Sequence, residues 1–166
     1  MFFREASSKF PNDPDNNELD ILAVHFSNEI AVQIRFNGEL DSTYEISVKG
    51  LNGIGKRFLA GHSIMGDDDE DDISFVGDMA NYQIATKLGN SNDTKLHVVC
   101  TQIAELYHQI ILPRNVDGMG ASNEDGITSR KILVTLSSKI WRDNNIGKDF
   151  DKLIYILQNI KKMYNI

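Results

Sequence analysis

A strand, a turn and one amphipathic helix follow one another between Tyr82 and Leu112. Polar and apolar residues alternate over 82–87 with the period of a strand, and a run of turn-forming residues occupies 88–93. Pro113 ends the helix that follows. A helix with a single apolar stripe must bury that stripe, and a sheet is its natural support. The stripe recurs at helical spacing: Leu96, Val99, Ile103, Leu106, Tyr107 and Ile110.

Other segments supply that sheet. We expect strands at 19–26, 30–36, 43–48, 82–87 and 131–137, with the first three forming an antiparallel meander that turns at Asn37-Gly38. A closing helix begins near Asp149 and is expected to bury Phe150, Leu153, Ile154, Leu157 and Ile160 or Lys161. The predicted fold class is α+β: a mostly antiparallel sheet with two main helices packed on one face and the other face used for dimer pairing.

The segments between these elements are polar or glycine-rich. Residues 1–17 are predicted to form a loose arm, and 50–80 and 113–130 mobile loops. The acidic run Asp67–Asp72 is expected to stay solvated because its charges repel, and Ile73–Val76 could add a short edge strand. The length of 166 residues fits a single domain over 1–166.

Charge and cysteine content exclude several classes. The net charge of −7 argues against a nucleic-acid binder, which needs a basic face. With Cys100 alone, no internal disulfide can form, which fits a reducing compartment; we expect a cytoplasmic protein, with the nucleus as a second location. Neither a signal peptide nor a membrane span is expected.

Three patterns could carry chemistry, and each has a simpler interpretation. The stretch Gly50–Lys56 has the spacing of a phosphate-binding loop, but Arg57 stands where the magnesium-binding hydroxyl should be. His97 and Cys100 lie three apart on a helix, yet Cys100 adjoins the apolar stripe and is interpreted as a buried small hydrophobe. The four histidines are scattered, so no metal site is expected. We therefore predict neither enzyme nor cofactor.

The uncovered face of the sheet is the candidate binding surface. On hydrophobicity alone, the helices are assigned to the more apolar face of each strand. The remaining face is small and semi-polar, as a separable subunit interface would be. Its predicted residues, the candidate dimer face, are Ile21, Ala23, His25, Ala31, Gln33, Arg35, Thr43, Glu45 and Ser47.

Three blocks of the chain resemble the proteasome assembly chaperone 3 family, in its fungal form. The chain departs from the short animal members by its N-terminal arm and longer loops. The resemblance covers most of the expected core, in the family's order of strands and helices. The blocks are 19–48, above all Ile21–Gln33; Lys87-Leu88-Gly89 followed by Asp93–Gln109; and Lys131–Leu136 followed by Phe150–Ile160.

The resemblance implies a non-enzymatic chaperone. It would pair with an assembly chaperone 4-like subunit and bind proteasome alpha subunits, the fifth alpha subunit being the expected one, to promote correct alpha-ring assembly. Lys49, Lys56 and Arg57 are then candidate rim contacts to the alpha subunit. Two alternatives stay open: a small self-pairing adaptor unrelated to proteasomes, and an enzyme whose cleft joins His97, Cys100 and a carboxylate.

Overall fold

A computed structural model of the chain describes residues 1–49, 81–114 and 130–166. The expectations for the loops at 50–80 and within 115–129 lie outside the described residues, as do the acidic run, the strand at 73–76 and the glycine-rich stretch. Residues 113, 114 and 130, assigned to a loop from the sequence, belong to the described part.

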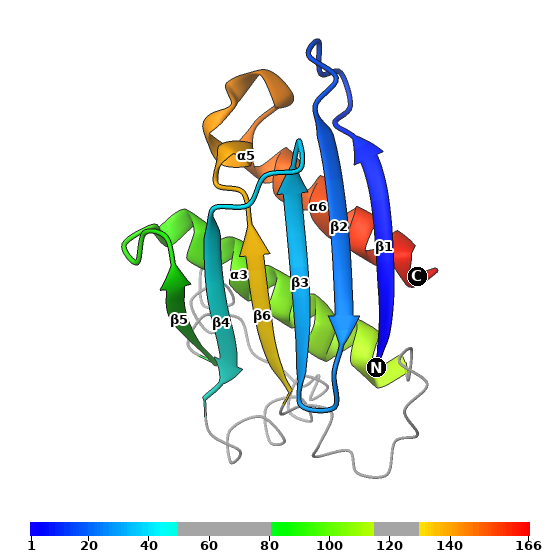
Figure 1. Cartoon of the computed structure of the whole chain (residues 1–166), viewed down its shortest axis with the longest axis vertical. Coiled ribbons are helices and arrows are strands. Elements are labelled where there is room, and N and C mark those ends of the chain that lie inside the picture. Colours follow the sequence, from blue (N-terminus) through cyan, green and yellow to red (C-terminus); the bar gives the residue numbers. More distant parts are fainter. Residues whose placement is uncertain (50–80, 115–129) are drawn as a thin grey trace, which may run out of the picture.

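One six-stranded sheet organises the described residues (Figure 1). Its spatial order is β1-β2-β3-β6-β4-β5. All neighbouring strands run antiparallel except the parallel pair β3–β6, so the sheet is mostly antiparallel as predicted. The strands are β1 Phe2–Lys9, β2 Glu18–His25, β3 Glu29–Phe36, β4 Ser42–Val48, β5 Tyr82–Leu88 and β6 Lys131–Leu136.

The predicted three-stranded meander is wrong. β6 lies between β3 and β4, and β4 therefore does not pair with β3. The Asn37-Gly38 turn does form, with φ of 51° and 78° at the two residues and Phe36 paired with Glu39. Its effect is local: beyond Glu39 the chain crosses the end of β6 before β4 starts. In this position both edges of the apolar β6 are paired, with β3 on one side and β4 on the other.

The loose arm predicted for residues 1–17 is also wrong. Phe2–Lys9 is the edge strand β1, which pairs with β2 over its whole length. The ring of Phe2 stacks on the ring of His25 with 4.3 Å between centroids. In the turn that follows, the Asp13 carboxylate accepts hydrogen bonds from the backbone N–H groups of Asp15 and Asn17 at 3.0 and 2.7 Å.

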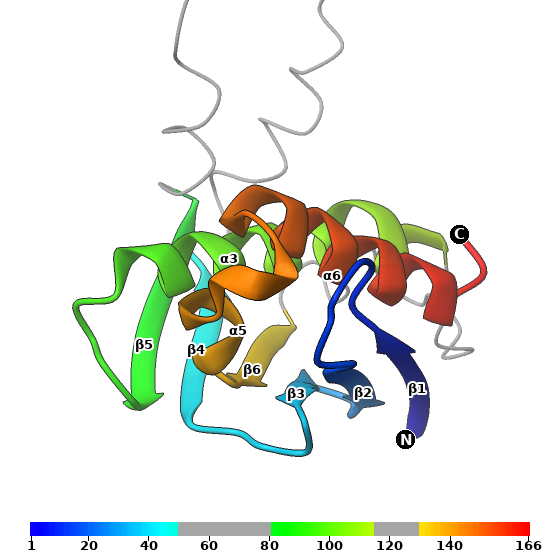
Figure 2. The ribbon, with the colours of Figure 1, turned by 90° about the horizontal axis from the view of Figure 1, so that it is seen from above.

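Both main helices lie on one face of the sheet, as Figure 2 shows. Helix α3, Thr94–Leu106, packs against β4 and begins at Asp93, whose carboxylate accepts from the Leu96 N–H at 3.1 Å. It continues as a π-helical turn, η1 Tyr107–Ile111, and a short 3₁₀ turn, η2 Leu112–Arg114. Helix α6, Asp149–Met163, packs against β1, and α5 Lys139–Arg142 and η3 Asn144–Ile146 lead into it.

The buried face of α6 differs from the predicted one. Ile156, Ile160 and Met163 turn inward, while Phe150 is 70% exposed and Ile154 36% exposed. Lys152 shares the inward face. Its buried ammonium group donates to the Asp143 carbonyl at 2.7 Å and lies 3.5 Å from a carboxylate oxygen of Asp149, and these contacts offset the cost of burying its charge. A hydrophobicity pattern assigns lysine to the exposed face of a helix, and the predicted buried face of α6 therefore left Lys152 out.

Asp41 holds the crossover from β3 to β4 against α5. Its carboxylate accepts from the Ser138 N–H at 2.9 Å, from the Ser138 hydroxyl at 2.8 Å and from the Ser42 hydroxyl at 2.8 Å. Burial alone would raise the pKa of Asp41, but these hydrogen bonds outweigh burial and hold the pKa below the ordinary value of 3.8. The folded state therefore gains stability from ionised Asp41 above that value and loses it as the pH falls through the depressed pKa.

We expect Asp41→Asn to lower the free energy of unfolding by about 1–2 kcal/mol at pH 7, because one set of charge-assisted hydrogen bonds is replaced by weaker ones. The difference from the unaltered chain should shrink as the pH falls below about 4, since protonation removes the same charge. Urea unfolding at pH 7, 5 and 3 measures it. An equal loss at all three values would mean that the charge of Asp41 is not what stabilises the crossover.

Candidate interaction surface on the open sheet face

The cross-strand register decides which residues face the helices. Ala23 pairs with Val32, and both are fully buried beneath the helix layer. The neighbouring pair, Val24 and Ala31, points to the other side and is only partly buried. We call that second side the open face, because none of the described helices covers it (Figure 2).

Six of the nine residues predicted for the dimer face lie on the open face. They are Ala31, Gln33 and Arg35 of β3 and Thr43, Glu45 and Ser47 of β4, and all are partly exposed.

Ile21, Ala23 and His25 do not lie there, and this part of the prediction is wrong. All three are buried under the helices, where the His25 Nε2 is 2.6 Å from the hydroxyl of Tyr164. Strand β2 is apolar on both sides, so hydrophobicity gave no reliable orientation. Its true open-face residues are Asp20, Leu22 and Val24.

A nearly continuous apolar row crosses the open face. Neighbours in the register lie side by side on one face, so the row can be followed strand by strand. It spans all six strands, and Glu45 is its one charged member. Phe3 at the β1 end is 63% exposed, which is high for a phenylalanine. In sheet order the row is Phe3, Val24, Ala31, Leu133, Glu45 and Ala85.

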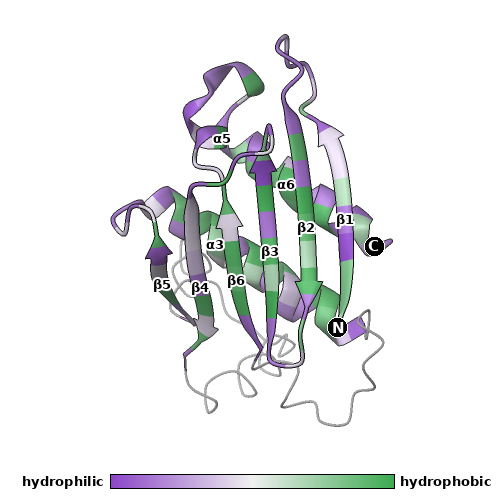
Figure 3. Ribbon diagram, in the orientation of Figure 1, coloured by the Kyte–Doolittle hydropathy of each residue, from purple (hydrophilic) through white to green (hydrophobic). Residues whose placement is uncertain are grey.

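Polar residues flank this row on the open face. The Glu45 carboxylate forms ion pairs with Lys87 of β5 and Lys131 of β6, with 3.6 Å between Oε1 and each Nζ. Gln33 accepts a hydrogen bond from the guanidinium of Arg35. Figure 3 shows polar and apolar residues following one another along β3 and β2, whose successive side chains point to opposite faces of the sheet. On the open face, the apolar row with its polar flanks matches the composition of interfaces between subunits that also exist apart.

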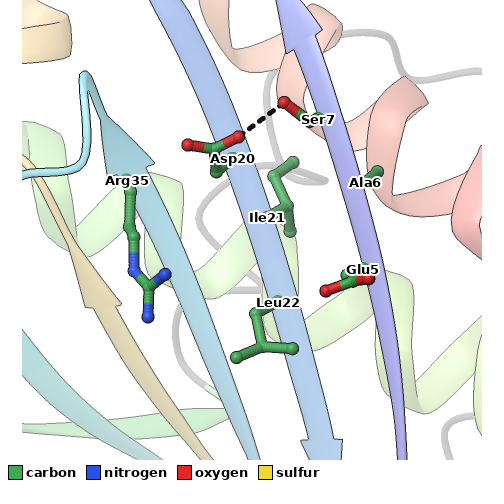
Figure 4. Close-up of a pocket in the computed structure, with 7 residues that line it drawn as sticks. All are labelled: Glu5, Ala6, Ser7, Asp20, Ile21, Leu22 and Arg35. Atoms are coloured by element: carbon green, nitrogen blue, oxygen red, sulfur yellow. Dashed lines mark hydrogen bonds between the residues drawn. The ribbon is translucent and has the colours of Figure 1, made fainter.

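A hollow lies on the open face beside the β1 edge (Figure 4). Leu22 and the side chains of Glu5, Ser7, Asp20 and Arg35 are among the residues that line it. The Ser7 hydroxyl donates to the Asp20 carboxylate at 2.6 Å. The hollow has a volume of about 480 Å³, enough to admit a side chain from another molecule.

The side chains considered as candidates for catalysis, His97 and Cys100, have structural environments. Cys100 is fully buried, and burial raises the pKa of its thiol far above the range in which a thiolate forms. His97 packs edge-on against Tyr44, with 5.5 Å between ring centroids. Within 1–49, 81–114 and 130–166, no three His, Cys, Asp or Glu side chains are grouped as metal ligands. None of the helices in these ranges is both long and apolar enough to cross a bilayer.

Of the three predicted rim contacts, one lies within the described residues. Lys49 is exposed at the end of β4, and its N–H donates to the Asn81 carbonyl at 2.8 Å. Lys56 and Arg57 lie outside the described residues. Among the apolar residues of the open face, sequence reasoning missed Phe3, Leu22, Val24, Leu133 and Ala85. The apolar residues on both sides of β2 were the one available signal that its second side also presents an apolar surface.

Comparison with known proteins gives a consistent result. A family model described as 20S proteasome chaperone assembly proteins 3 and 4 matches residues 2–161. The chain is 46% identical over 162 residues to proteasome chaperone 3 of Saccharomyces cerevisiae, covering 90% of this chain and 87% of that one. It also resembles a chain in the crystal structure of a chaperone complex for yeast 20S proteasome assembly, with a TM-score of 0.66, 40% identity and 99% of each chain covered.

Proposed function

Because the chain belongs to the family of 20S proteasome chaperone assembly proteins 3 and 4, whose role is assembly and not catalysis, we propose that it pairs with a protein 4-like subunit and promotes correct alpha-ring assembly. The pairing surface is the open face. The resulting heterodimer binds proteasome alpha subunits, the fifth alpha subunit foremost. It acts in the cytoplasm and the nucleus.

The apolar row on the open face is the observation that carries this proposal. A sheet with helices on one side leaves its other side in water unless a second layer covers it. The second layer would most simply be the open face of a similar subunit, stacked as in a two-sheet sandwich. Burying Phe3, Val24 and Leu133 would stabilise the pair, since each apolar side chain removed from water contributes about 1–3 kcal/mol. The similarity to a chain from a yeast chaperone complex supports pairing with a second subunit.

Native mass spectrometry of purified components tests the proposal. The chain mixed with a protein 4-like subunit should give a 1:1 heterodimer, and addition of the fifth alpha subunit should give a ternary complex. Neither step should change with ATP or a chelator, because no ligand is required for surface complementarity. A chain that formed only homodimers and captured no alpha subunit would favour the self-pairing adaptor and contradict the proposal.

Lys49, Lys56 and Arg57 are retained as rim contacts to an acidic patch on the alpha subunit. Reversing all three to Glu should slow capture of the alpha subunit by about tenfold at low salt and less at high salt, since rim charges act mainly on the association rate. The heterodimer itself should keep its affinity. Stopped-flow association kinetics over a salt series measures the effect; unchanged rates throughout would remove these residues from the contact.

A further inference from the structure

We infer that the partner places a basic side chain in the hollow beside β1 and acidic groups over Lys87 and Lys131, so that charge fixes its orientation across the strands. The inference rests on the proposed function, because it assumes that the partner covers the open face. It adds the chemistry of the partner and the residues of this chain that select it.

The hollow carries uncompensated negative charge. Within the described part of the chain, neither Glu5 nor Asp20 forms an ion pair. Arg35 lies opposite Asp20 in the register, yet its guanidinium donates to Gln33 and not to that carboxylate. Two carboxylates and one guanidinium leave a net charge of −1 around the hollow.

Covering the hollow therefore requires a cation. A carboxylate removed from water without a partner charge is strongly destabilising, so an apolar or acidic group placed here would oppose pairing. A lysine or arginine side chain meets the need, because its ammonium or guanidinium group can reach Glu5 and Asp20 while its aliphatic stem contacts Leu22. The second oxygen of Asp20 is available for that contact, since Ser7 bonds to the first.

The opposite half of the open face carries the opposite charge. Lys87 and Lys131 share the single carboxylate of Glu45, which leaves a net charge of +1 on the open face of β4, β5 and β6. Glu29, at the start of β3, lies opposite Lys131 in the register, but within the described part of the chain it forms no ion pair with either lysine. Both lysines are about half exposed, with side-chain exposures of 51% and 54%. A partner turned end for end across the strands would bring its cation over these lysines and its acidic groups over the hollow. The charge pattern thus admits one orientation and opposes the reverse.

The test is the double variant Glu5→Gln with Asp20→Asn, which removes both charges and keeps the shape and the Ser7 hydrogen bond. We expect its affinity for the protein 4-like subunit to fall about tenfold at low salt, with the difference shrinking as salt rises. The thermal midpoint of the chain alone should not move. Titration calorimetry over a salt series gives the affinities, and Glu5→Gln alone should show part of the effect.

The matched control is Asp15→Asn with Asp151→Asn, which makes the same charge change in the turn after β1 and on α6. It should leave the affinity within about twofold. Lys87→Gln with Lys131→Gln should weaken pairing as the hollow variant does. If the hollow variant binds like the unaltered chain at every salt concentration while Ala31→Arg abolishes pairing, the inference is wrong and the proposed interface stands. If Ala31→Arg also pairs normally, the proposed interface itself is wrong.

Discussion

Ala31→Arg is expected to fold and to lose its partner. Ala31 lies at the middle of the apolar row, between Val24 and Leu133, and is partly exposed. In the free chain an arginine there can extend into water. In the heterodimer its charge would be buried without a partner, which costs about 3–5 kcal/mol and weakens pairing by more than a hundredfold. Calorimetry with the protein 4-like subunit measures the affinity, and thermal unfolding of the chain alone verifies folding.

Ala23→Arg provides the matched comparison, because the same substitution falls on the adjacent strand but on the other face. Ala23 is fully buried beneath the helices, and its variant should fail to fold, so its loss of pairing would say nothing about the interface. Gln158→Arg, on the exposed side of α6, adds the same charge away from the sheet and should pair normally. Normal pairing by a folded Ala31→Arg variant would exclude the open face as the interface.

The segments that could be predicted from the sequence share a strong local signal. Strand β3 alternates over its whole length, and the stripe of α3 has only one face that can be buried. The sequence predicted both elements with nearly the bounds that the structure has, and the α+β fold class was inferred from them. Burial here is decided by the residues of the element itself, so the local pattern carries the answer.

Strand β2 and helix α6 were misjudged because, in each, hydrophobicity and burial under the same chain do not coincide. β2 places Ile21 under the helices and Val24 on the open face, and both positions are apolar, as the proposed pairing requires. On α6, Phe150 and Ile154 are exposed while Lys152 is buried. Local hydrophobicity reports that a side will be covered, but it does not say whether the cover comes from the same chain.

The order of the strands required information that no local pattern holds. The turn at Asn37-Gly38 predicts a hairpin, and its geometry is indeed present. What it cannot reveal is that β6, which begins at Lys131, enters between β3 and β4. The gain from inserting an apolar strand with two paired edges outweighs the local preference for a simple meander.

The C-terminal Tyr164 is expected to be a principal contributor to stability. It is 4% exposed, and its hydroxyl lies 2.6 Å from the His25 Nε2 and 3.2 Å from the hydroxyl of Tyr107. Burial raises the pKa of Tyr107 well above its ordinary value, so that hydroxyl stays protonated and available for hydrogen bonding. Through His25, which stacks on Phe2, this cluster joins the end of the chain to its first strand.

Tyr164→Ala should lower the free energy of unfolding by about 3–5 kcal/mol, because it leaves a cavity the size of an aromatic ring and removes both hydrogen bonds. Tyr164→Phe keeps the ring and should cost about 1–2 kcal/mol, which separates the packing contribution from that of the hydroxyl. Urea unfolding of the three chains measures both steps. Gln158→Ala serves as the control, since Gln158 is exposed on α6. If Tyr164→Ala unfolds like the unaltered chain, the packing of Tyr164 against His25 does not stabilise the fold.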